Sequence, residues 1–185
     1  MPLFGTILML LSIALPVVAQ EDDPRCDELW FARNLLFDHA GHCFDSTLGQ
    51  AVFDNADCTT ATPALDERAA ANVARPRAAE TAYGCAIDTR RTPLRDQEYL
   101  AFYRDLQDLP VVELYPGGCI GYRGAPIPLC NGASNSVSVI GTAAPGQSLG
   151  LSYQDFGDWT FVTVHPAIPA CPYWLTNGCG LAPIR

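Results

Sequence analysis

The hydrophobic positions in the first half of the chain follow the spacing of an α-helix. Leu29 and Leu36 are seven residues apart, as are Trp30 and Phe37, so both pairs fall on one helical face. Acidic residues just before them favour the positive end of the helix dipole. Gly41 is the expected left-handed stop. The pattern therefore predicts a helix that buries an aromatic and aliphatic stripe.

One charged residue interrupts this apolar face. Arg33 lies between Leu29 and Leu36 on the stripe. A charged side chain on a buried face must be hydrogen-bonded. We expect Arg33 to bind loop carbonyls or a carboxylate of its own chain, in preference to a ligand.

Two further helical segments follow. Residues 61–83 are alanine-rich, and Pro76 is expected to kink or split the helix that they form. Thr92 and Pro93 then suit the start of another helix. Its apolar stripe has helical spacing and consists of Tyr99, Phe102, Tyr103 and Leu106. We expect this stripe to pack between two modules rather than to form a cofactor site.

From residue 111 onward the pattern changes to short hydrophobic runs between Gly, Pro and Asn clusters. The runs are Val111–Tyr115, Val137–Ile140, Leu149–Tyr153, Trp159–Val164 and Tyr173–Leu175. Such runs predict β-strands in a small barrel or sandwich. The predicted fold class is α+β, with a helical N-terminal module and a small C-terminal β-barrel.

The start of the chain is typical of a secretory leader. The first charged side chain is Glu21, and residues 3–18 are apolar, with Pro16 near the end of the run. Small residues up to Ala19 suit signal peptidase. We expect residues 1–19 to be a signal peptide and the protein to be periplasmic or secreted. An uncleaved anchor is the alternative, because no Lys or Arg precedes the run.

Cysteines and charges both divide the remaining chain in two. Residues 20–110 hold 17 acidic residues and 9 arginines, against 3 and 2 in residues 111–185. Each part holds four cysteines, which suits disulfides in an oxidising compartment and allows three pairings per part. Among these pairings we favour Cys26–Cys85 with Cys43–Cys58, and Cys119–Cys130 with Cys171–Cys179. The predicted domains are a helical module (24–88), a helical linker (89–110) and a β-rich domain (111–185).

The charge balance excludes several classes of function. The net charge is −9 and the chain contains no lysine. P-loop, Schiff-base and Ser–Lys chemistries are therefore absent. Nucleic acids and anionic membranes are unsuitable partners for so acidic a chain. After leader removal we expect no stable membrane insertion.

Three patterns in the sequence could indicate catalysis or metal binding. Ser148 occupies the centre of a G-x-S-x-G sequence, with His165 downstream, but strands rather than the required strand–turn–helix are predicted around it. His39 and His42 lack further zinc ligands at matched spacing. Carboxylate pairs could flank a glycosidic bond, although acids in an acidic protein are usually solvated. These pairs are Asp54 with Asp57 and Asp155 with Asp158. We therefore predict no catalytic residue, metal site or cofactor.

The first module resembles a known family. The segment Phe31-Ala32-Arg33-Asn34, followed by Phe37, Gly41 and Phe44, is similar to the YARHG domain, a short helical module of exported bacterial proteins. The resemblance covers about Leu29 to Cys58. It implies a setting in the cell envelope and a following small β-rich domain. It carries no functional residues.

The second module resembles a bacterial SH3-like domain. The similar segments are Val139–Thr142, Pro145-Gly146, Gly157–Trp159 and Trp174-Leu175. The resemblance implies binding of peptides or cell-wall fragments.

The candidate binding residues are the aromatic residues Tyr122, Tyr153, Trp159, Tyr173 and Trp174. Their alternative role is packing at the edges of a small core. We expect an exported, non-catalytic envelope protein that binds a peptide, a glycan or another protein. A small hydrolase of the envelope or a secreted enzyme inhibitor is the alternative.

Overall fold

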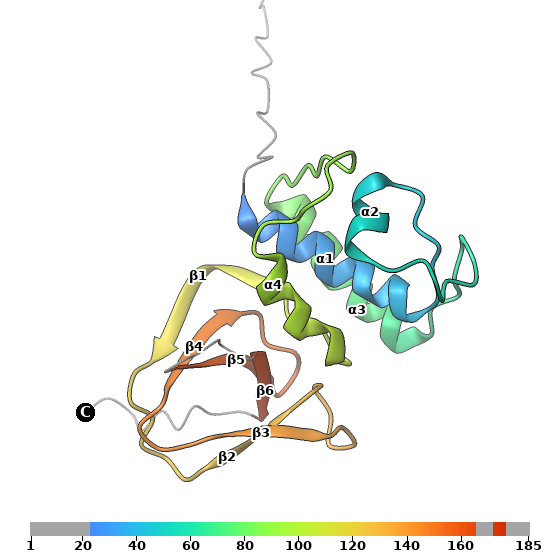
Figure 1. Ribbon diagram of the computed structural model, residues 1–185. Helices are drawn as coiled ribbons and strands as arrows, with labels where there is room; N and C mark the ends of the chain where they lie inside the picture. The colour runs from blue at the N-terminus through green and yellow to red at the C-terminus, as the bar shows by residue number, and fades with distance from the viewer. Residues whose placement is uncertain (1–22, 166–171, 177–185) are drawn as a thin grey trace, which may run out of the picture.

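The computed structural model describes residues 23–165 and 172–176, which form helices followed by a β-sheet (Figure 1). The helical elements are α1 (Pro24–His39), α2 (Thr47–Val52), α3 (Glu67–Ala82), α4 (Gln97–Leu100) and the 3-10 helix η1 (Ala101–Asp105). The strands are β1 (Val112–Cys119), β2 (Ile127–Cys130), β3 (Val139–Ala143), β4 (Ser148–Tyr153), β5 (Trp159–His165) and β6 (Pro172–Thr176). The α+β class is confirmed. None of the described helices has the length and apolar character needed to cross a membrane.

Helix α1 has well-defined ends. Asp23 caps its N-terminus by accepting a hydrogen bond from the Arg25 amide at 2.9 Å, and Pro24 occupies the first turn. Gly41 follows the helix with a φ of 78°. A Cβ at this position would lie 2.4 Å from Thr59 Oγ1, so a glycine is required here. The predicted stop is confirmed.

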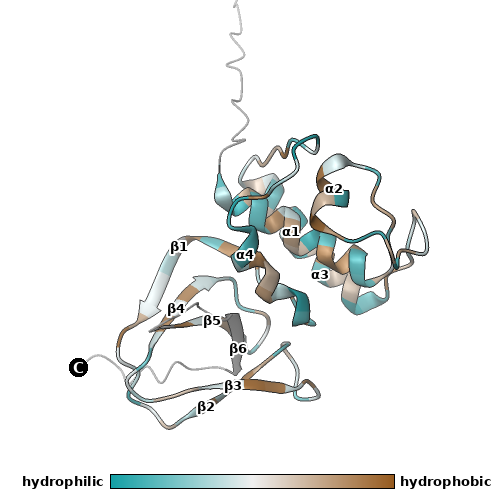
Figure 2. Ribbon diagram, viewed as in Figure 1, coloured by the Kyte–Doolittle hydropathy of each residue, from teal (hydrophilic) through white to brown (hydrophobic). Residues whose placement is uncertain are grey.

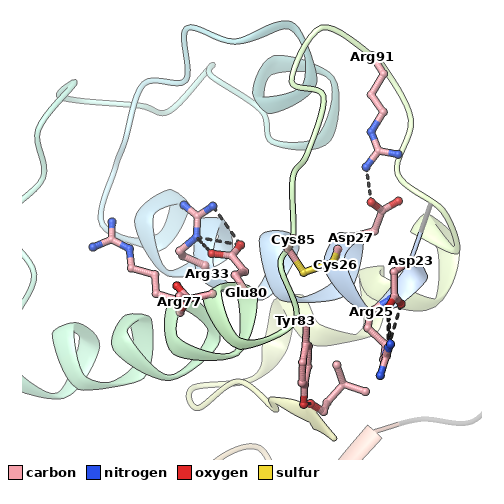
Figure 3. The surroundings of a disulfide bond; sticks show 12 residues. Asp23, Arg25, Cys26, Asp27, Arg33, Arg77, Glu80, Tyr83, Cys85 and Arg91 are labelled. Atoms are coloured by element: carbon pink, nitrogen blue, oxygen red, sulfur yellow. Dashed lines mark hydrogen bonds and ion pairs between the residues drawn. A yellow bond between two sulfur atoms is a disulfide. The ribbon is translucent and has the colours of Figure 1, made fainter. Parts of the chain in front are cut away.

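Helix α3 packs beside α1 and continues through Pro76 as one element. Of the two predicted effects of Pro76, a kink or a split, the split does not occur. Pro76 belongs to a buried stripe with Asn72, Val73 and Ala79, and this packing maintains the helix despite the missing backbone donor. Across the α1–α3 contact, the guanidinium of Arg33 donates to the Glu80 carboxylate at 3.0–3.2 Å (Figure 3). The expectation that Arg33 binds a carboxylate is confirmed.

The segment before the sheet joins the two parts of the fold. Helix α4 begins at Gln97, not at Thr92 and Pro93, and its N-cap residue Asp96 has a φ of 51°. Tyr103 of η1 is fully buried and meets the ring of Phe161 on β5 at a centroid distance of 5.9 Å. Both residues belong to the main hydrophobic core, which otherwise consists largely of helical residues. The expected packing is confirmed for Tyr99, Tyr103 and Leu106, whereas Phe102 of the same stripe is exposed.

The six strands form one antiparallel sheet in the order β1-β4-β5-β6-β2-β3. Strands β1 and β3 are the edges, so the sheet is open and no closed barrel forms among the described residues. Strand β2 was missed because Pro126 and Pro128 make its sequence unlike a strand. It runs along the edge strand β3 and meets β6 only at Cys130 and Trp174.

The sheet has a small core of its own, formed by Tyr122, Leu129, Ala143, Leu149 and Val162. Phe161 of β5 belongs to the main core, and Tyr153 and Trp159 pack against it. The edge strand β3 is hydrophobic along its sequence (Figure 2) and exposes Val139 and Ile140. The two parts of the chain therefore share one main core and are not independent modules.

Two of the four expected disulfides are present. Cys26–Cys85 joins the start of α1 to the end of the α3 region (Figure 3), and Cys43–Cys58 closes the loop around α2. These pairings are confirmed. The expected Cys119–Cys130 bridge is wrong, because both residues are free thiols and three strands separate β1 from β2 in the sheet. Cys171 and Cys179 lie outside the described residues.

Candidate functional site

The carboxyl group of Glu28 lies where the helices meet the sheet. On α1 this residue shares a face with Ala32 and Leu35, which are fully buried. Glu28 is itself half-buried. Its Oε1 accepts a hydrogen bond from the Tyr103 hydroxyl at 2.7 Å.

Three tyrosine hydroxyls form a chain that ends at this carboxyl group. The Tyr103 hydroxyl lies 3.0 Å from that of Tyr153 on β4, which lies 3.2 Å from that of Tyr99 on α4. A hydroxyl donates only one hydrogen bond. Because Tyr103 donates to Glu28, it can only accept from Tyr153. Tyr153 is also within hydrogen-bonding range of Glu28, so its hydrogen points to Tyr103 or to Glu28, and Tyr99 donates to Tyr153. We call this arrangement of Tyr99, Tyr153, Tyr103 and Glu28 the relay.

The relay changes the acidity of its members. Burial raises the pKa of Glu28 to about 7, the hydrogen bonds from Tyr103 and Tyr153 oppose this rise, and the negative charge of Asp96 adds to it. Burial and the charge of Glu28 raise the pKa values of Tyr103 and Tyr153. The tyrosines therefore stay protonated, and Glu28 is the group in the relay that titrates near neutral pH.

Both ends of the relay line a pocket of about 390 Å³. The lining residues are Pro24, Arg25, Glu28, Arg95, Asp96, Tyr99 and Leu100. Two arginines and two acidic residues face a cavity that also has apolar and aromatic walls. This volume and mixture are typical of a small-molecule or peptide-end site.

Two ion pairs hold the pocket wall in place (Figure 3). Arg25 binds the carboxylate of Asp23 through Nε at 3.0 Å, which lowers the pKa of Asp23. The buried Asp27 accepts from the Arg95 amide at 2.9 Å and also pairs with Arg91. The segment that carries Arg95 is therefore attached to the start of α1, which the Cys26–Cys85 disulfide also anchors.

A second buried carboxylate joins the helices to the sheet on another side of the fold. Asp108 is fully buried and accepts from Arg68 Nε at 3.0 Å, Asn72 Nδ2 at 2.8 Å and the Ala133 amide at 2.7 Å. Burial opposes its ionisation, but these hydrogen bonds outweigh burial and keep the pKa of Asp108 below its usual value. With every contact made inside the protein, we assign Asp108 a structural role.

The five aromatic residues proposed from the sequence do not form one surface. Tyr122 is buried in the small core and its hydroxyl donates to the Ala125 carbonyl at 2.7 Å. Tyr153 belongs to the relay, and Trp159 packs against the main core. Tyr173 and Trp174 pair with β5 through the backbone of β6, and their side chains lie outside the described part of the structure.

Ser148 has no nucleophile-elbow geometry. It opens strand β4 after the turn at Gly146, and its Oγ lies 3.4 Å from the Gly121 amide. A G-x-S-x-G serine needs a sharp strand–turn–helix, which is absent at this strand. The backbone of His165 pairs with Ser148 across β4 and β5, but its side chain is not among those described.

The other candidates also show no shared chemistry. The ring of His42 packs edge-on against Phe44, with centroids 4.6 Å apart. No group of three or more possible metal ligands occurs among the described residues. Asp54 accepts from a backbone amide two residues later, and Asp155 accepts from Thr160 Oγ1 at 2.6 Å.

Tyr99 and Tyr103 were expected at the contact between the modules, whereas Glu28 was not among the predicted site residues. A signal for it was present, since Glu28 precedes Ala32 and Leu35 at helical spacing and so shares their buried face. The partner Tyr103 is 75 positions away along the chain, and no local pattern predicts that contact.

Comparison with known families agrees with this two-part architecture. The YARHG domain family matches residues 6–81, and a domain of unknown function, DUF4453, matches residues 84–175. The first part of the chain is therefore similar to the YARHG domain and the second to DUF4453, and the YARHG resemblance seen in Phe31–Asn34 is confirmed. The pocket lies at their junction, with α1 on one side and the residues before α4 on the other. No curated protein and no solved structure matches the chain.

Proposed function

We propose that this protein is an exported, non-catalytic binding protein of the cell envelope that holds its ligand at the junction of its two domains. The observation that carries the proposal is the pocket at the ends of the relay. It combines a carboxyl group whose pKa is raised to about 7 with an aromatic wall and charges of both signs. Perturbed ionisable groups in a cavity are characteristic of functional sites.

The disulfide bonds and the similarity to the YARHG domain family both support export of this protein. The Cys26–Cys85 and Cys43–Cys58 disulfides suit an oxidising compartment. The YARHG match points to exported proteins, and residues 1–19 carry the sequence pattern of a signal peptide. We propose that the mature protein begins after Ala19 and is located in the periplasm or outside the cell.

The pocket favours a small polar ligand or the end of a larger one. Its volume of about 390 Å³ accommodates one or two amino-acid or sugar units. A peptide or glycan end is therefore the proposed ligand class. An SH3-like relationship of the β-sheet, inferred from residues 139–175, would add peptide binding on that domain.

The test is a direct binding measurement on the mature, oxidised chain. Short peptides and cell-wall glycan fragments are titrated into the wild type and into Tyr99→Ala, which removes the aromatic wall of the pocket. Leu114→Ala, an exposed position on β1, is the matched control. The proposal expects binding that Tyr99→Ala weakens at least tenfold and the control preserves. Binding that is equal in the two variants would place the ligand elsewhere.

A second function is favoured by one observation. Glu28, with its pKa near 7, shares the pocket with Asp96, and a carboxyl group of this acidity suits general acid catalysis. A small glycoside hydrolase using these two acids is the alternative. Turnover of glycan fragments that Glu28→Gln abolishes and Ser148→Ala preserves would establish it in place of binding alone.

A further inference from the structure

The hydrogen bonds of the relay are donated toward Glu28, and this direction depends on whether Glu28 carries a proton. With Glu28 ionised, every hydroxyl hydrogen points toward this carboxylate. Tyr99 donates to Tyr153, Tyr153 donates to Tyr103 or to Glu28, and Tyr103 donates to Oε1 of Glu28. The carboxylate is the final acceptor. In this state the relay offers the pocket only acceptor atoms at its two ends.

Adding a proton to Glu28 gives the relay one hydrogen-bond donor more than its internal hydrogen bonds use. If the proton stays on the second oxygen of Glu28, the carboxyl group itself becomes the donor. If the chain reverses, the Tyr99 hydroxyl is released from Tyr153 and becomes the donor. Glu28 and Tyr99 both line the pocket, so in either case the surplus donor appears on its wall.

The charge of the pocket changes in the same step. The lining contains Arg25 and Arg95 against Glu28 and Asp96, and Arg25 is also paired with Asp23. With Asp23 included, the formal balance is −1 when Glu28 is ionised and zero when it is protonated. The groups around Glu28 include Tyr103 of η1, Tyr153 of β4, Tyr99 of α4 and the charged Asp96 before α4, and Arg25 and Arg95 share the pocket lining with it.

We propose that the pocket binds the carboxylate of a peptide end or of an acidic sugar, and that binding is accompanied by uptake of one proton at Glu28. The inference rests on the proposed function, because it names the ligand chemistry of the same pocket. A carboxylate accepts the surplus hydrogen bond and meets a pocket that has lost one negative charge. An ionised Glu28 would instead face it as a like charge across the pocket.

The experiment is isothermal titration calorimetry of the mature, oxidised chain between pH 5.5 and 8.5. The probes are acetyl-dialanine with a free carboxyl end, the same peptide as its amide, glucuronate and glucose. The expected dissociation constant of a carboxylate probe is constant below pH 7, where Glu28 already holds its proton, and rises about tenfold per pH unit above it. Whether the peptide acid or glucuronate shows this behaviour identifies the source of the carboxylate.

Two variants make the result specific to the relay. Glu28→Gln keeps an acceptor for Tyr103 and adds a permanent donor, so it should bind the carboxylate probe at pH 8.5 about as tightly as at pH 5.5. Glu113→Gln removes one exposed acid on β1 and should keep the wild-type slope. Circular dichroism and intact mass confirm that both variants are folded and oxidised.

Several outcomes overturn the inference. These are a pH slope in Glu28→Gln equal to that of the wild type, equal binding of the acid and the amide, or no binding of either carboxylate at pH 5.5. Failure of the proposed function is separate, because it requires that the wider set of peptides and glycans also shows no binding that depends on Tyr99. A neutral ligand in the pocket would therefore preserve the function and eliminate this inference.

Discussion

Replacing Glu28 with glutamine should stabilise the protein, by an amount that grows as the pH rises from about 4.5 to 7 and is constant above that. The folded chain raises the pKa of Glu28 from its usual 4.5 to about 7. Below pH 4.5 the carboxyl group is protonated in both states and contributes no difference. Between pH 4.5 and 7 the folded state keeps a proton that the unfolded state has lost, so this group makes stability fall as pH rises.

The size of the effect follows from the two pKa values. Above pH 7 the ionised carboxylate destabilises the fold by about 3 kcal/mol relative to its protonated form. Glutamine is neutral at every pH and its Oε1 can still accept from Tyr103. The expected gain in unfolding free energy for Glu28→Gln is therefore near zero at pH 4 and about 3 kcal/mol at pH 8.

The assay is urea denaturation of the oxidised protein at pH 4, 6 and 8, followed by tryptophan fluorescence. Other carboxylates, including Asp108, also make stability depend on pH, so the quantity of interest is the difference between variant and wild type. Glu113→Gln is the control and should stay within about 0.5 kcal/mol of the wild type at every pH. The reasoning would be refuted if the difference in unfolding free energy between Glu28→Gln and the wild type did not change with pH, or if the variant were less stable than the wild type at pH 8.

Three other substitutions test neighbouring parts of the account. Asp96→Asn removes the charge that raises the pKa of Glu28 and should move its titration midpoint, followed by carbon-13 NMR, to lower pH; an unchanged midpoint would contradict the assigned role. Asp108→Asn should destabilise the fold by about 2–3 kcal/mol at pH 7 in urea denaturation. That difference should shrink below pH 4, because a carboxylate with a lowered pKa stabilises only while ionised, and a constant difference would contradict this. Gly41→Ala should lower the free energy of unfolding by about 1–2 kcal/mol or more, because φ is positive at this position and an added Cβ would clash with Thr59 Oγ1. A variant with wild-type thermal stability would show that the turn adapts.

Local patterns were sufficient for much of the fold. The stripe of α1, its stop at Gly41 and the pairing of Arg33 with a carboxylate all follow from residues close in sequence. The division of the cysteines left three pairings for the first four, and the favoured one, Cys26–Cys85 with Cys43–Cys58, is present. In each case the spacing of residues or their chemical needs leaves few alternatives.

Features that depend on tertiary packing were not predictable in this way. The helix after residue 92 begins only at Gln97, and α3 continues through Pro76 because one of its faces is buried. The order of the strands places Cys119 and Cys130 far apart in the sheet. This order could not be predicted, because the prolines of β2 make its sequence unlike a strand.

Only part of the candidate site could be predicted from the sequence. Tyr99 and Tyr103 were expected between the modules, because their spacing places them on one helical face. Their contact with Glu28 and Tyr153 joins three distant parts of the chain, and the raised pKa of Glu28 comes from burial at that meeting point. Physical properties of this kind arise only once the chain has folded.

The most direct test of the account is the titration of the Glu28 side-chain carboxyl carbon by NMR in the oxidised wild-type protein. The relay and its burial require a midpoint near pH 7, accompanied by chemical-shift changes in the rings of Tyr99, Tyr103 and Tyr153 at the same pH. A midpoint near 4.5 with unaffected tyrosines would show that Glu28 is an ordinary solvated acid and that the junction holds no relay.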